Sequence, residues 1–259
     1  MTTTVVIMRR LLPTAVLAGS LLLTGCSSGT DEDAGATATA TTTATTTASS
    51  PAGSAPATTS GTVGGCPATR NALTGTANAP TLDIDGDGKA DTEWIATEPA
   101  ADGSVEFGVQ TASGDAISAD VQSASPIARS LLVADVTGTG ELVALVSDGR
   151  QVLLYAISDC SIVPVQNAQG QQYAFDLGFT GFGTGVGCAD VDGDGVRDLV
   201  GLQADGTSIT STVVTLAGPK ATNGTSRTSA DATAAQLAAA HQVTCGDLTL
   251  AADGVTSGP

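Results

Sequence analysis

Two acidic stretches decide the fold: residues 83–91 read DIDGDGKAD, and residues 190–198 read DVDGDGVRD. When such a loop curls, the carboxylates at its first, third and fifth positions converge, and glycine at the sixth position permits the sharp turn. The backbone carbonyl at the seventh position and the carboxylate at the ninth complete a cage of oxygen atoms. Oxygen ligands in this number suit Ca²⁺, with Mg²⁺ a weaker fit. The predicted calcium ligands are Asp83, Asp85, Asp87, the Lys89 carbonyl and Asp91 in one loop, and Asp190, Asp192, Asp194, the Val196 carbonyl and Asp198 in the other.

Two other interpretations of these stretches are possible. An EF-hand loop needs a glutamate at its twelfth position and flanking helices, but that position is Trp94 or Gly201, and strand-like sequence follows. The second interpretation is an Asp/Gly turn that binds no metal. Neighbouring carboxylates repel each other by about 1 kcal/mol per pair even in water, so an empty loop tends to open. Two matching loops in one chain favour metal binding.

A third copy of the pattern lies between the other two. Residues 133–143 keep the frame, but Thr137 and Thr139 replace aspartates and Val143 stands at the ninth position, so we expect this loop to be metal-free. A fourth, eroded copy lies at residues 245–248. The copies recur roughly every 55 residues, a period typical of a repeat with several short strands.

Residues 181–183 (GFG), with the acidic loop and the strand-like residues 198–201 that follow, resemble the FG-GAP/VCBS-type repeat of integrin α-subunit propellers and many bacterial surface proteins. The resemblance covers roughly residues 80–250. It implies β-propeller blades with calcium in hairpin loops, held by the aspartates named above. Propellers of this family commonly have seven blades, and this chain has room for about four.

The predicted fold is therefore all-β, with propeller-like blades and one short C-terminal helix. Short apolar runs predict strands in the following ranges: 104–110, 130–136, 141–147, 151–158, 161–165, 197–203 and 208–216. The helix is predicted over residues 231–241, with Ser229 or Asp231 as a possible N-cap.

The N-terminal part of the chain predicts export. Residues 1–25 combine two arginines with a short apolar run and end in LTG before Cys26, which resembles the lipobox of bacterial lipoproteins. This implies lipidation of Cys26 and anchoring at the outer face of the cell membrane; an ordinary secretory signal is the alternative. Residues 26–64 are rich in Thr and Ala and predict a disordered linker. The folded domain is then expected over residues 65–259.

Four further cysteines are present: Cys66, Cys160, Cys188 and Cys245. An even number in an exported domain predicts disulfides, and the count alone allows three pairings. Cys188 and Cys245 each stand two residues before the leading aspartate of a repeat, which favours pairing them and leaves Cys66 for Cys160.

The formal net charge of −17 argues against nucleic acid as a partner. The only histidine is His241, and the sequence contains no G-x-S-x-G nucleophile elbow. We therefore expect a non-catalytic binding or adhesion scaffold whose partner is a surface protein or a glycan. The alternative is an exported hydrolase acting on cell-wall glycan, which would gather acidic and polar side chains in one deep pocket.

Overall fold

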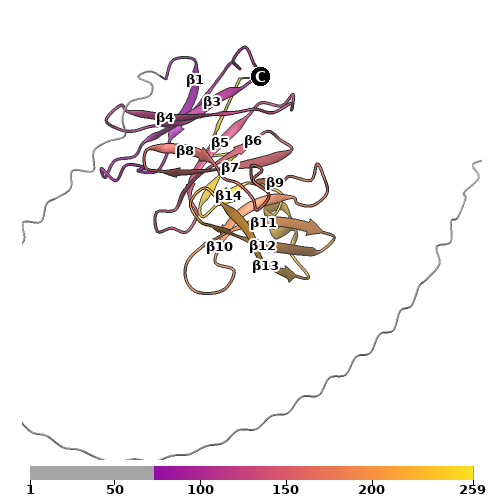
Figure 1. The fold of residues 1–259 in the computed structure, drawn as a ribbon. Coiled ribbons are helices and arrows are strands. Elements are labelled where there is room, and N and C mark those ends of the chain that lie inside the picture. Colours follow the sequence, from indigo (N-terminus) through magenta and orange to yellow (C-terminus); the bar gives the residue numbers. More distant parts are fainter. Residues whose placement is uncertain (1–72, 259) are drawn as a thin grey trace, which may run out of the picture. The chain divides into compact units, whose positions relative to one another are not determined.

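The computed structural model describes residues 73–258, which form three larger antiparallel β-sheets and one two-stranded sheet (Figure 1). Sheet 1 contains β1 (Thr76–Pro80), β2 (Thr92–Ala96), β3 (Val105–Gln110) and β4 (Ala116–Val121). Sheet 2 contains β16 (Val255–Thr256), β5 (Ser130–Asp135), β6 (Leu142–Ser147), β7 (Gln151–Ser158) and β8 (Ser161–Pro164), and β9 (Ala174–Asp176) also pairs with β7. Sheet 3 contains β10 (Gly185–Ala189), β11 (Asp198–Asp205), β12 (Ser208–Leu216) and β13 (Ala221–Ser229). A short hairpin joins β14 (Thr244–Cys245) to β15 (Leu248–Thr249), and α1 spans Ala234–Ala239.

Sheet 2 lies between the other two sheets and is buried on both faces. Because side chains alternate across a strand, Leu131 and Val133 of β5 join the core shared with sheet 1, whereas Leu132 and Ala134 join the core shared with sheet 3. The same division runs through β6 and β7. This two-sided burial explains why the strands of sheet 2 are continuous apolar runs rather than alternating ones.

Sheet 1 is tied to sheet 2 by a buried carboxyl group. Glu93 of β2 is 1% exposed, and its carboxylate accepts a hydrogen bond of 2.7 Å from the backbone N–H of Val133 in β5. Burial raises the pKa of Glu93 to about 8, against the lowering effect of that hydrogen bond. The neighbouring Trp94 is fully buried.

The C-terminal residues return to the middle of the fold. β16 pairs with β5, and the Ser257 hydroxyl accepts a hydrogen bond of 2.8 Å from the N–H of Arg129. The N–H of Gly258 donates to the carbonyl of Thr97, which directly follows β2. The last described residues thus lie against both sheet 1 and sheet 2.

The prediction of a mostly β fold with one short helix is confirmed, and each predicted strand range contains a strand. In the described part of the chain the sheets are separate, and none closes on itself. The eroded fourth copy corresponds to the β14–β15 hairpin.

The helix N-cap prediction was wrong, because Thr233 caps α1. The Thr233 hydroxyl accepts a hydrogen bond from the N–H of Gln236, and the Gln236 side chain accepts one from the N–H of Thr233.

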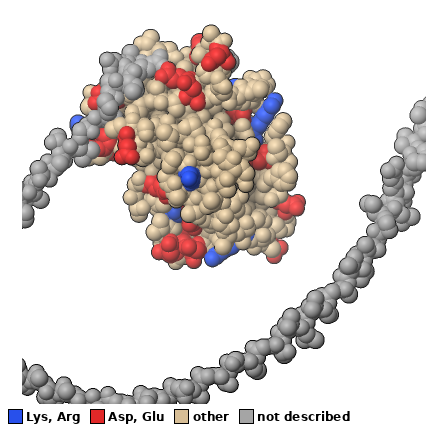
Figure 2. All heavy atoms as spheres, viewed as in Figure 1, with Lys and Arg blue, Asp and Glu red and all other residues tan. Residues whose placement is uncertain are grey.

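Within residues 73–258, no helix is long and apolar enough to cross a membrane. The predicted signal peptide, Cys26, the linker and Cys66 lie outside the described residues. Figure 2 shows acidic side chains in small groups over one face of the domain, with few basic side chains among them.

Candidate functional site

The three acidic loops recognised in the sequence are equivalent in the structure. Residues 83–91 lie between β1 and β2, residues 135–141 connect β5 to β6, and residues 190–197 connect β10 to β11. Each loop therefore joins the first and second strands of its own four-strand run. The repeat in the sequence is a repeat in topology.

A shared set of backbone hydrogen bonds shapes each loop. The leading aspartate accepts from the N–H groups of the fourth and sixth loop residues, at 2.8 and 2.7 Å for Asp83, 2.8 and 2.9 Å for Asp135, and 2.6 and 3.0 Å for Asp190. Both donors are glycines with positive φ in all three loops, between +75° and +106°. The loops need glycine at two positions, because L side chains rarely adopt that backbone conformation; sequence analysis had identified only the sixth.

In two loops the structure brings three carboxylates together. One oxygen from each of Asp83, Asp85 and Asp87 lies within 4.8 Å of the others, and the same holds for Asp190, Asp192 and Asp194. Calcium binds oxygen at about 2.3–2.6 Å, so two ligands of one ion lie at most about 5 Å apart. Within each group, the three oxygens therefore lie close enough together to contact one ion of that size.

The ninth-position carboxylates lie outside these two groups. Asp91 is 2% exposed and accepts hydrogen bonds from the N–H groups of Ile84 at 2.7 Å and Ala112 at 2.9 Å. Burial raises the pKa of Asp91, with smaller contributions from nearby aspartates and an opposing effect of its hydrogen bonds. Asp198 accepts in the same way from Val191 at 3.1 Å. These two carboxylates close the base of each loop.

The seventh-position residues differ between the two loops. The Lys89 ammonium group lies 3.1 Å from a carboxylate oxygen of Asp87, so it partly neutralises the first group. Val196 is 37% exposed and offers no such charge to the second group. A basic group reaches the loop of residues 190–198 from sheet 3 instead, where Arg227 of β13 donates to the carbonyl of Val191.

The second loop carries hydroxyls instead of carboxylates, and an arginine reaches it from sheet 3. The hydroxyls of Thr137 and Thr139 lie 2.9 Å apart. The guanidinium of Arg197 donates to the backbone carbonyl of Asp135 at 2.8 Å and lies against Gly138. Arg197 belongs to the 190–198 loop, so the loops of sheets 2 and 3 contact each other directly.

The predicted Cys188–Cys245 disulfide is present, with an S–S distance of 2.03 Å. It joins the end of β10 to the β14–β15 hairpin. Cys188 stands two residues before Asp190. Cys160 is also disulfide-bonded, and its predicted partner Cys66 lies outside the described residues.

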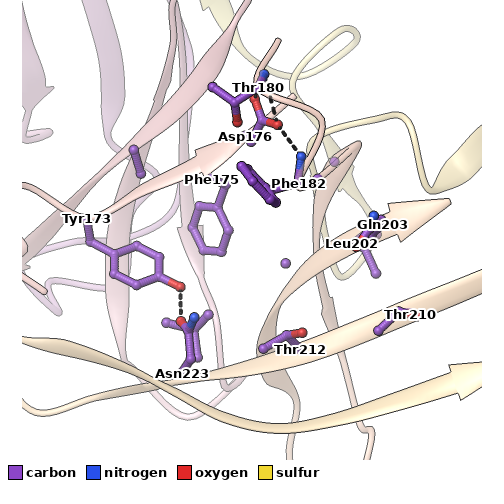
Figure 3. A pocket seen from close by; sticks show the side chains of 15 residues that line it. Tyr173, Phe175, Asp176, Thr180, Phe182, Leu202, Gln203, Thr210, Thr212 and Asn223 are labelled. Carbon is purple, nitrogen blue, oxygen red and sulfur yellow. Dashed lines mark hydrogen bonds between the residues drawn. The ribbon is translucent and has the colours of Figure 1, made fainter. Parts of the chain in front are cut away.

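A cavity of about 330 Å³ was not anticipated by the sequence (Figure 3). It lies between β9 with the loop that follows and the face of sheet 3 that is turned toward sheet 2. The side chains that define it are Tyr173, Phe175, Asp176, Phe182, Gln203, Thr210, Thr212 and Asn223. The only feature of the sequence that pointed to this cavity was Phe182, which stands between two glycines.

Asp176 shapes the loop beside this cavity. Its carboxylate accepts hydrogen bonds from the N–H groups of Thr180 at 3.0 Å and Phe182 at 2.9 Å. Partial burial would raise the pKa of Asp176, but these hydrogen bonds outweigh it and lower the pKa to about 2. The group is therefore an ionised structural anchor at neutral pH.

Two glycines before the 190–198 loop serve close packing. A Cβ at Gly185 would lie 2.5 Å from the carbonyl oxygens of Ala240 and Gln242, and a Cβ at Gly183 would lie 2.5 Å from that of Asp176. These positions leave no room for a side chain.

Comparison of the chain with protein-family models, with curated proteins and with solved structures finds no match.

Proposed function

We propose that the protein is an exported, lipid-anchored scaffold with FG-GAP/VCBS-like repeats that calcium stabilises, and that it binds a partner at the cell surface without catalysing a reaction. The observation that carries the proposal is the pair of equivalent loops, each with three carboxylates whose oxygens lie within 4.8 Å of one another. Lipidation of Cys26 would hold this acidic domain at the outer face of the membrane, with residues 26–64 as a spacer.

The loops support calcium as a structural ion. Each begins at the end of one strand and ends at the start of the next, so an ion bound there would fix the first hairpin of sheet 1 or sheet 3. The neighbouring backbone amides already hold the leading aspartates in place. The carboxylates of each group repel one another, and a bound cation would attract each of them and so offset that repulsion.

The polar cavity supports binding rather than glycoside hydrolysis. Hydrolysis of a glycosidic bond ordinarily needs two carboxyl groups on either side of the bond. Among the described residues that line the cavity, Asp176 has the one carboxylate. Its low pKa and its two backbone donors suit a structural role and not that of a general acid.

Calcium titration of the purified protein tests the proposal. We expect two ions per chain by isothermal titration calorimetry and a higher melting temperature. At a free calcium concentration one hundred times Kd, one site adds about 2.7 kcal/mol of stability. For a domain of this size that corresponds to about 5–10 °C in melting temperature. Mg²⁺ at the same concentration should give a smaller rise.

Single substitutions assign the sites. Asp85→Asn and Asp192→Asn should each reduce the stoichiometry from two ions to one. Asp205→Asn, an exposed aspartate at the end of β11, is the matched control and should leave both sites intact. The absence of heat and of a melting shift up to millimolar Ca²⁺ would rule out the calcium-stabilised scaffold.

A further inference from the structure

We propose that the cavity beside β9 is a binding site for a neutral oligosaccharide. The inference deepens the scaffold function proposed above, on which it rests, by naming the chemical class of the partner. Figure 3 shows the cavity enclosed by aromatic rings on one side and by polar side chains of sheet 3 on the other. No residue of the loops 83–91 and 190–198 lines the cavity.

The cavity exists because one face of sheet 3 changes character along its strands. Residues two apart on a strand share a face, so Leu199, Gly201 and Gln203 of β11 form one row, opposite Val214, Thr212 and Thr210 of β12. Leu199 and Val214 fill the core against sheet 2. Farther along the rows, the Phe175 ring packs over Gly201, and the polar side chains of Gln203, Thr210 and Thr212 line the cavity.

The polar groups of the cavity offer hydrogen bonds to hydroxyl groups. Asn223 accepts a hydrogen bond from the Tyr173 hydroxyl through Oδ1, and its Nδ2 has no partner among the described residues. The amide group of Gln203 likewise has none in this part of the chain. The hydroxyls of Thr210 and Thr212 bond to hydroxyls on β13 and keep acceptor capacity. An apolar ligand would bury these groups without partners, which opposes its binding.

Aromatic rings supply the apolar part of the site. Phe182 is 83% exposed at the rim of the cavity. Phe179 on the same loop lies outside the cavity, and the Arg150 guanidinium stacks over its ring at 4.6 Å from the centroid. The chain has only four phenylalanines, so an exposed phenylalanine at the rim of a cavity is unusual and indicates a contact surface. Phe175 and Tyr173 form the inner wall, with ring centroids 5.1 Å apart. The C–H face of a sugar ring packs well on such rings.

The charges of the cavity favour a neutral ligand. Asp176 carries the only charged side chain among the described lining residues, and its carboxylate is already bonded to the backbone of its own loop. Among residues 73–258, no lysine or arginine lines the cavity to hold a phosphate, sulfate or carboxylate group. Its volume lies near the lower end of the range for ligand sites, about 300–1,000 Å³, which suits one or two sugar rings.

The test is binding of the full-length mature protein to an array of neutral oligosaccharides of glucose, galactose, mannose or N-acetylglucosamine. The oligosaccharide retained best is then titrated in solution. Phe182→Ala should weaken binding at least tenfold, and Gln203→Ala several-fold. Phe179→Ala is the matched control, because it removes another exposed ring of the same loop, one that does not line this cavity; binding should change less than twofold.

Each outcome has one meaning. Retention of no neutral glycan by folded protein, unchanged binding by Phe182→Ala, or retention of anionic glycans or peptides instead would overturn the inference. Thermal unfolding of each variant with and without Ca²⁺ is measured on the same samples. Loss of glycan binding with an intact calcium response bears on the cavity alone. A missing calcium response with intact glycan binding overturns the calcium-stabilised scaffold and leaves the cavity assignment standing.

Discussion

Replacing both Cys188 and Cys245 by alanine should remove a large part of the domain's stability. The disulfide closes a loop of 57 residues. In the chain-entropy treatment, a cross-link over that length stabilises the folded state by about 4 kcal/mol. Small domains have about 5–15 kcal/mol in total, so the variant should fold but lie near the limit. With a urea m-value of about 2 kcal/mol/M, the midpoint should fall by about 2 M.

Urea unfolding followed by far-UV circular dichroism and by the fluorescence of Trp94 measures the change. Trp94 is fully buried in sheet 1, far along the chain from the disulfide, so agreement of the two signals tests whether the whole domain responds. Val243→Ala is the packing control: it trims a buried side chain next to β14 without opening a cross-link. If the double variant loses no more stability than Val243→Ala, the disulfide does not stabilise the domain by restricting the unfolded chain.

Two further substitutions test the contacts around the cavity and between the loops. Asp176 has its pKa lowered to about 2, so its stabilising effect is present above the ordinary pKa near 4 and is lost as the pH falls through about 2. Asp176→Asn should therefore cost about 1 kcal/mol at pH 7, after allowance for solvent screening, and almost nothing at pH 2; an equal cost at both pH values in urea unfolding would contradict this. Arg197→Ala removes the guanidinium bond to the Asp135 carbonyl and should cost about 1–2 kcal/mol. A loss no larger than that of Arg227→Ala, an exposed arginine on β13 that bonds to a loop carbonyl, would show that the contact between the loops adds no stability.

The sequence was most informative where a local rule sets the backbone. The acidic loops could be placed from Asp83 and Asp190 because their carboxylates order the backbone that immediately follows. The second loop was recognisable without its other aspartates, because Asp135 keeps the same spacing to Gly138 and Gly140, whose N–H groups bond to its carboxylate. The Cys188–Cys245 pairing followed from the same repeat register.

The missed elements depend on long-range contacts. β13 (Ala221–Ser229) is almost wholly exposed and has no apolar alternation to mark it. In its register with β12, two pairs of hydroxyl groups are hydrogen-bonded across the strands: Thr210 with Thr228 and Thr212 with Ser226. The cavity was equally hidden, because its walls come from two segments separated in sequence and meet only after sheets 2 and 3 stack. Apolar runs predicted the strands of sheet 2 but could not show that both of its faces are covered.

Because sheet 2 supplies side chains to both apolar cores, neither outer layer is an independent folding unit. Removing residues 185–258 would expose Leu132, Leu145 and Leu154, which now face sheet 3. Such a truncated chain would expose a broad apolar surface and aggregate. Denaturation should accordingly be cooperative, with the amide protons of β6 exchanging with solvent only when the entire domain opens.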